Sequence, residues 1–155
     1  MTENTHYHRD FTIERVFPSC KAHVWAAWSI REKKAAWLRN AALEMDFRPG
    51  GFERSSFRND MGEHVNETRY FEIKEGERIV LAYSMAVNAR VHTISLTTIT
   101  FTNENGGTRP KYTEQMCLIP PSDGVEGRKH GWSALLHGLG DYLVTDTREE
   151  SIDAR

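Results

Sequence analysis

Residues 126–145, EGRKHGWSALLHGLGDYLVT, form the segment of the chain that decides the fold. The apolar residues in this segment follow one another at intervals of three, one, three, three and one: Trp132, Leu135, Leu136, Leu139, Tyr142 and Leu143. This spacing places all of them on one face of an α-helix. An amphipathic helix needs a second apolar surface to cover its stripe, so the rest of the chain must supply one.

The chain between Leu43 and Ile119 supplies that surface. Here apolar and polar residues alternate with a period of two, and turn sequences such as Pro49-Gly50-Gly51 interrupt the alternation. The pattern predicts strands over 43–48, 52–58, 64–73, 78–87, 90–102 and 108–119. Because short turns join each strand to the next, we expect an antiparallel meander with one apolar face.

The first part of the chain adds three more elements. Arg9 to Phe17 alternates like a half-buried strand that Pro18 ends, and two short helices follow, one from Cys20 and one over 32–38. The whole order predicts an α+β domain in which a curved antiparallel sheet of about seven strands wraps around the long C-terminal helix and leaves a pocket between them. We expect one domain over 1–155, with a core over about 9–145 and loose ends.

Composition narrows the class of function. The chain has 155 residues and a net charge of −2, and it has no basic stripe that could bind nucleic acid. It also has no apolar run long enough to span a membrane. The start of the chain lacks the apolar stretch of a signal peptide, so we expect a cytoplasmic protein, either a monomer or a homodimer. No CxxC pair, phosphate loop or dinucleotide fingerprint occurs, so we expect neither a metal nor a cofactor.

Several short strings, taken in order, carry a resemblance to a known family. They are Phe11 to Phe17, Val24-Trp25, Trp37, Phe47 to Gly51, Glu77 to Val80, Gly106 to Arg109, Thr113 to Gln115 and His130-Gly131-Trp132. Over residues 10–144 they resemble the AHSA-type branch (activator of heat-shock-protein-90 ATPase homologues) of the START and birch-pollen-allergen superfamily, also called SRPBCC. The resemblance implies the helix-grip fold. One departure is Pro110, where the family more often has an apolar residue, and we expect an edge position or a bulge there because proline cannot donate a ladder hydrogen bond.

Glu114 is the most unusual polar residue of the predicted sheet. It shares strand parity with Tyr112, Met116 and Leu118, so it should face the core, where a carboxylate is costly unless it is paired. It would then be either a functional group of the pocket or the partner of an arginine on the sheet. A bulge at Pro110 could instead turn it outward.

The remaining candidates are aromatic residues and histidines. Aromatic side chains suit a ligand cavity, and they serve equally well as core. His130 and His137 share a face of the final helix with Asp141, but this face is opposite the apolar stripe and should be solvated, which argues against a metal site. The predicted ligand-binding set is Trp37, Tyr70, Tyr83, His92, Tyr112, Glu114, Trp132 and Leu135, with no catalytic or metal-binding residue.

Three functions remain open. The first is binding of a hydrophobic small molecule between sheet and helix, for sequestration, transport or a stress-related role. The second, which the resemblance implies because some members of that superfamily are of this kind, is a cyclase- or aromatase-like enzyme acting on polyketides, with Glu114 as general acid or base. The third is a protein-interaction module of co-chaperone type, which would need an exposed apolar patch on the outer face of the sheet. The outward residues Glu44, Asp46 and Glu72 disfavour the third, and binding is favoured over catalysis.

Overall fold

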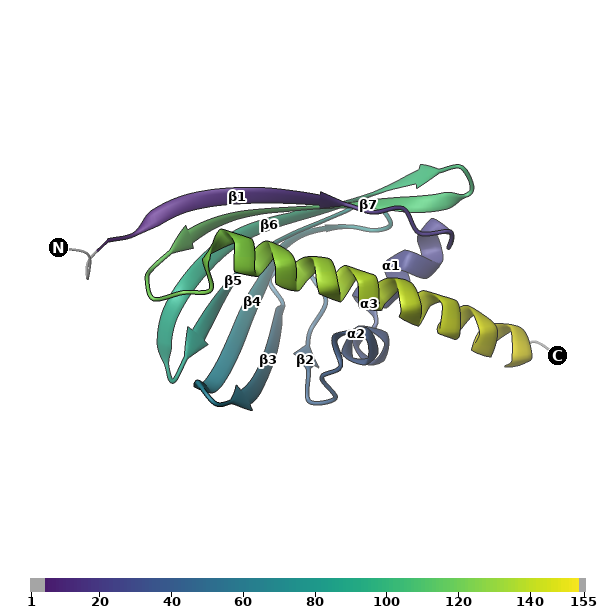
Figure 1. Ribbon diagram of the computed structural model, residues 1–155. Helices are drawn as coiled ribbons and strands as arrows, with labels where there is room; N and C mark the ends of the chain where they lie inside the picture. Colours follow the sequence, from purple (N-terminus) through teal and green to yellow (C-terminus); the bar gives the residue numbers. More distant parts are fainter. Residues whose placement is uncertain (1–4, 154–155) are drawn as a thin grey trace.

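A curved antiparallel sheet holds one long helix across its concave face (Figure 1). The computed structural model describes residues 5–153, with side chains as far as residue 146. The elements in chain order are β1 (Tyr7–Glu14), α1 (Lys21–Ser29), α2 (Arg31–Leu38), β2 (Glu44–Met45), β3 (Phe52–Asn59), β4 (Gly62–Lys74), β5 (Arg78–Val87), β6 (Arg90–Glu104), β7 (Gly107–Leu118) and α3 (Gly124–Asp153).

The sheet has seven strands in the order β1-β7-β6-β5-β4-β3-β2. From β2 to β7 each strand pairs with its neighbours in sequence, and β1 adds itself to β7. This arrangement confirms the predicted helix-grip fold, including both short helices after the first strand. The bounds differ from the prediction most clearly at three places: β1 ends at Glu14 and not at Phe17, β2 covers only Glu44–Met45, and α3 continues to Asp153 instead of ending near Thr145.

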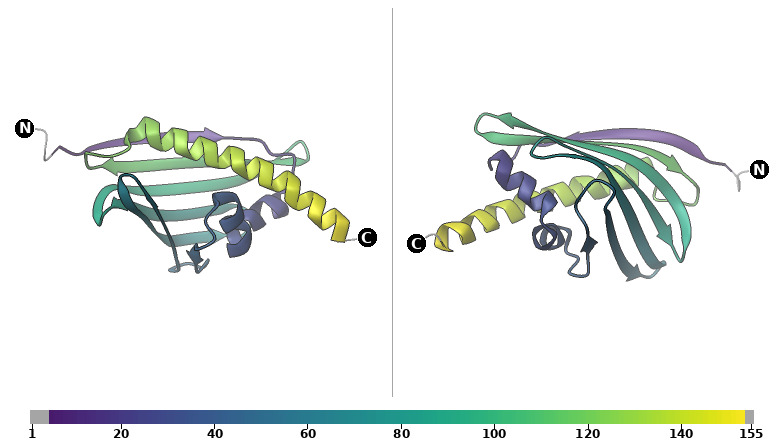
Figure 2. Two further views of the ribbon diagram at one scale, coloured as in Figure 1. Left: turned by 60° about the horizontal axis from the view of Figure 1, so that its bottom comes forward. Right: turned by 180° about the vertical axis from the view of Figure 1, so that it is seen from behind.

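The apolar stripe of α3 forms the centre of the core. Leu136, Leu139 and Leu143 are at most 2% exposed, while Trp132, Leu135 and Tyr142 are partly buried and pack against the same cluster. Helices α1 and α2 cover the concave face beside the C-terminal half of α3 (Figure 2). The stripe and the inner face of the sheet therefore bury each other.

None of the described helices, α3 included, combines the length and the apolar composition that crossing a membrane requires.

Pro110 corrects one expectation from the sequence. Strand β7 is internal, between β1 and β6, and Pro110 pairs with Phe101 without a register shift. The Pro110 carbonyl accepts a hydrogen bond from the backbone N–H of Arg15, just after β1 ends at Glu14. In a strand the N–H and C=O of one residue point to the same side, so the missing donor faces the place where β1 leaves the sheet. No bulge is needed, and the inward direction of Glu114 is preserved.

Replacing Leu139 by alanine tests the burial of the stripe. Leu139 is fully buried, so Leu139→Ala should lower the free energy of unfolding by about 2–5 kcal/mol in urea titrations. Val144→Ala is the matched control on the same helix, since Val144 is 47% exposed and its truncation should have little effect. Equal losses in the two variants would contradict the packing of α3 on the sheet.

Candidate functional site

A cavity of about 370 Å³ lies between the inner face of the sheet and helices α1, α2 and α3. Aromatic rings form much of its wall: Trp28, Tyr83, Tyr112 and Trp132. The Trp132 ring stacks on Tyr112 with 4.3 Å between centroids, and it lies nearly parallel to Trp28 at 6.2 Å. Leu81, Ile99 and Leu135 add aliphatic surface, so most of the wall is apolar.

Helix α3 contributes two glycines to this wall. Gly127 and Gly131 line the cavity and are exposed, so they lie where the cavity opens. A Cβ atom built on Gly131 would meet nothing within 4 Å. Because glycine costs about 1 kcal/mol relative to alanine inside a helix, its presence here keeps space open at the expense of helix stability.

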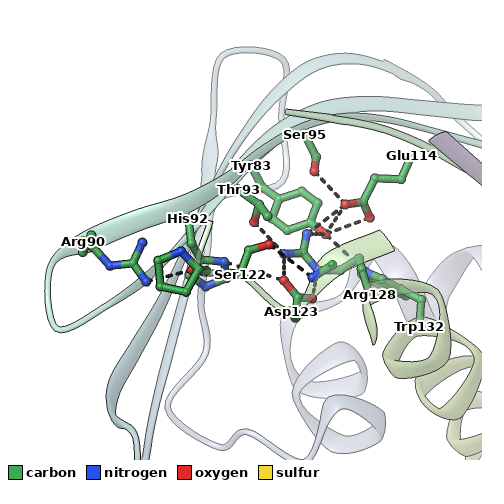
Figure 3. Close-up of polar contacts among 12 residues, drawn as sticks. Tyr83, Arg90, His92, Thr93, Ser95, Glu114, Ser122, Asp123, Arg128 and Trp132 are labelled. Carbon is green, nitrogen blue, oxygen red and sulfur yellow. Dashed lines mark hydrogen bonds and ion pairs between the residues drawn. The ribbon is translucent and has the colours of Figure 1, made fainter. Parts of the chain in front are cut away.

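Arg128 connects the start of α3 to the sheet (Figure 3). Its side chain is 4% exposed, and each nitrogen of the guanidinium donates hydrogen bonds. Nη1 donates to Tyr83 Oη and to Glu114 Oε2, Nη2 to Thr93 Oγ1 and Asp123 Oδ1, and Nε to Asp123 Oδ2. Burial by itself lowers the pKa of Arg128, but Tyr83, Asp123 and Glu114 outweigh it and raise the pKa above its ordinary value. The charge is thus retained although the group is buried.

Glu114 is the buried carboxylate that this arginine meets. It is 0% exposed and accepts hydrogen bonds from Tyr83, Tyr112, Ser95 and Arg128, at 2.6–2.9 Å. Burial, with the nearby Glu114 carboxylate adding to it, raises the pKa of Tyr83 and of Tyr112, so both phenols remain protonated donors. The structure shows the pairing with an arginine that was one of the sequence-based alternatives, but this arginine comes from helix α3 and not from the sheet.

A second buried ion pair lies in the wall where α2 faces β3. Lys34 Nζ donates to Glu53 Oε1 at 2.6 Å, and Tyr70 Oη donates to the same oxygen at 2.5 Å. The Lys34 ammonium also lies over the rings of Trp28 and Tyr70. Burial, followed by the charge of Glu53, raises the pKa of Tyr70.

His92 lies beside Asp123, one of the residues that hold Arg128 (Figure 3). It is 5% exposed, and its Nδ1 is 3.6 Å from Asp123 Oδ1. Burial lowers the pKa of His92, and the nearby Asp123 only partly offsets this effect. The folded protein therefore favours the neutral form of His92.

Half of the predicted ligand-binding set lies in the cavity wall: Tyr83, Tyr112, Trp132 and Leu135. The other four lie outside it. Trp37 donates to the Ala27 carbonyl in the core, and Tyr70 donates to Glu53. Glu114 accepts from Tyr83 and Arg128, and His92 lies beside Asp123.

Sequence reasoning missed the charged residues of the wall: Lys34, Glu53, Asp123 and Arg128. A signal for Arg128 was present. It precedes Trp132 by four positions and Leu135 by seven, so it continues the apolar stripe of α3 as a charged member. Lys34 and Glu53 gave no comparable signal. The cavity is therefore more polar than a single Glu114 would make it.

The part of the chain that the structure describes contains no set of side chains that could bind a metal ion. No three His, Cys, Asp or Glu residues cluster there in a way that could hold an ion. His130 and His137 are exposed on α3, as their position opposite the stripe predicted.

Comparisons with known proteins identify relatives across most of the chain. The family described as Activator of Hsp90 ATPase homolog 1-like protein matches residues 21–144. A solved structure from Rhizobium leguminosarum is 31% identical and superposes with a TM-score of 0.87, over 92% of this chain and 98% of that chain. One from Rhizobium loti is 32% identical, with a TM-score of 0.84 over 89% and 99%. Ara h 8.0201, at 13% identity and a TM-score of 0.73 over 90% and 99%, shares the fold alone. No curated protein matches the chain.

Removing Arg128 tests the buried ion pair between Arg128 and Glu114. Arg128→Met should lower the free energy of unfolding by about 3–5 kcal/mol, because Glu114 would remain buried without its cation. Adding Glu114→Gln should return part of that loss, as measured by urea unfolding of the single and double variants.

Arg78→Met provides the control for loss of an arginine. Arg78 pairs with Glu72 in solvent, where side-chain exposures are 42% and 50%, and should contribute far less to stability. Strictly additive losses in the Arg128 and Glu114 variants would contradict the coupling.

His92 predicts a pH dependence of stability. Its pKa is below the ordinary 6.5 in the folded state, so the unfolded chain binds the proton more readily. The free energy of unfolding should therefore fall as the pH drops from about 6.5 towards the lower pKa of the folded state. His92→Gln should make this fall shallower in urea titrations across that range, and an unchanged slope would rule out a buried neutral histidine.

Proposed function

The chain belongs to the Activator of Hsp90 ATPase homolog 1-like family, within the helix-grip superfamily that the sequence predicted. We propose that it binds a largely apolar small molecule between the sheet and α3. The observation that carries the proposal is the cavity of about 370 Å³ with its wall of aromatic rings. Small-molecule sites span about 300–1,000 Å³ and are mostly apolar with a few placed polar groups, which describes this wall.

The construction of the wall supports binding in three ways. Trp28, Tyr112 and Trp132 hold one another in stacked positions, so this part of the wall is preorganised before a ligand enters. Gly127 and Gly131 leave room on the α3 side, between the side chains of Arg128, Trp132 and Leu135. Affinity would come from burial of apolar surface, at about 25 cal/mol per Å² before ordering costs.

The geometry of Glu114 disfavours the alternative of a cyclase-like enzyme. A general acid or base must come within about 2.6–3.2 Å of the proton that it transfers. Glu114 is 0% exposed and already accepts hydrogen bonds from four side chains. We assign it the role of positioning Tyr83, Tyr112 and Arg128.

The alternative of a protein-interaction module depends on a different surface. The outer face of the sheet carries Ile94 and Leu96, which are 51% and 44% exposed, so it is less polar than the charged residues in the sequence suggested. These side chains point away from the cavity, and a binding role for the cavity does not involve them. Loss of partner binding on Leu96→Lys, with cavity binding unchanged, would favour this alternative.

Filling the cavity from α3 tests the proposal. Prodan, a neutral naphthyl ketone, shifts its emission to the blue in an apolar site, and titration with the protein should give a saturable shift. Gly131→Leu should weaken Prodan binding by about ten-fold or more, because a helical leucine points back over Gly127 and into the cavity.

Ala134→Leu is the matched control, since it places the same side chain on an exposed position of α3. Neither variant replaces a buried residue, so both should fold. Equal Prodan affinity in the two variants would place the probe elsewhere and overturn the proposed function.

A further inference from the structure

We propose that Trp28 and Lys34 form a subsite for an oxygen acceptor, and that the cavity selects neutral carbonyl-bearing ligands over carboxylates. This inference rests on the proposed function and names the class of ligand. Three independent features of the wall carry it: a donor without a partner, a second donor beside it, and a charge balance that leaves no cation for an anionic ligand.

The indole N–H of Trp28 is the donor without a partner. Trp28 is 1% exposed and lines the cavity, and its Nε1 has no hydrogen-bond partner within residues 5–153. Most buried donors in proteins are satisfied, and an unsatisfied one costs about 1–3 kcal/mol. The ring cannot turn easily to find a partner, because it packs against Trp37 at 5.0 Å and Phe101 at 6.1 Å. An acceptor atom on a ligand would satisfy it.

The ammonium of Lys34 is the second donor. It lies 5.4 Å from the centroid of a Trp28 ring, and its side chain is 5% exposed. An ammonium has three N–H bonds, and Glu53 Oε1 accepts one of them at 2.6 Å. A carbonyl oxygen accepts through two lone pairs, and in the proposed subsite one ligand oxygen takes a hydrogen bond from each residue.

The charges around the cavity decide what kind of oxygen fits. Lys34 is already compensated by Glu53, and Arg128 by both Glu114 and Asp123. Among the described residues, the cavity wall together with the buried Glu114 therefore contains two cations and three carboxylates. A ligand carboxylate would add a further negative charge to a buried site without a free cation, which is strongly unfavourable. A ketone, ester or quinone oxygen carries no such penalty.

Three naphthalenes of similar shape separate these contributions. 2-Acetylnaphthalene offers a neutral acceptor, 2-naphthoate a carboxylate and 2-ethylnaphthalene no acceptor. Isothermal titration at pH 7.5 should give the ketone about ten-fold or more tighter binding than the carboxylate, and about five-fold tighter binding than the hydrocarbon.

Trp28→Phe removes the N–H and keeps an aromatic ring, so it should abolish most of the preference for the ketone over the hydrocarbon. Trp132→Phe is the matched control in the same wall, because the Trp132 N–H faces Tyr83 Oη at 3.4 Å. It should weaken both probes and keep their ratio. The ratio is taken within each variant, so a change in the folded fraction cancels.

The outcomes distinguish this inference from the proposed function. Equal affinity of wild type for ketone and hydrocarbon, or 2-naphthoate binding as tightly as the ketone, would overturn the subsite while leaving cavity binding intact. Equal loss of the ketone preference in Trp28→Phe and Trp132→Phe would overturn the assignment to Trp28. If none of the three probes binds and Prodan does not either, the proposed function itself fails.

Discussion

The buried contact between Arg128 and Glu114 is the constraint on which the rest of this structure depends. Placing two charges in a protein interior costs several kcal/mol per ion unless their hydrogen bonds are complete. Here they are complete, because four side chains from β5, β6, β7 and the segment before α3 accept five hydrogen bonds from the guanidinium. A contact that tolerates so little displacement fixes the first turns of α3 against the sheet, whereas apolar packing alone would allow sliding.

The cavity is a consequence of that fixed position. Beyond Arg128 the helix is anchored by Leu136, Leu139 and Leu143. On either side of Arg128 the helix presents a glycine, Gly127 or Gly131, to the space over the sheet. The aromatic side chains that border this space pack on one another and do not fill it. Polar groups lie at two separate places in the wall, Arg128 on α3 and Lys34 on α2, so a bound molecule can be oriented by its own polar atoms.

Regular elements and their order could be predicted from the sequence because strand and helix periodicities are local properties. The inward direction of Glu114 was also predictable, since parity in β7 follows from Met116 and Leu118. The partners of Glu114 were not, because Arg128 reaches it only after α3 docks on the sheet. Lys34 and Glu53 are 19 positions apart, and their pairing depends on how α2 packs over β3. Trp37 and Tyr70 were assigned to the cavity because aromatic residues serve core and cavity alike, and only three-dimensional packing separates the two uses.

The central claim is that the space between the sheet and α3 is a binding site whose polar end is at Trp28 and Lys34. A crystal structure of the protein with 2-acetylnaphthalene tests it most directly. The account predicts the naphthalene ring among Trp28, Tyr112 and Trp132, with its carbonyl oxygen within hydrogen-bonding distance of Trp28 Nε1 and Lys34 Nζ. Density for the probe on the outer face of the sheet, or in the cavity with the carbonyl directed away from both donors, would contradict it.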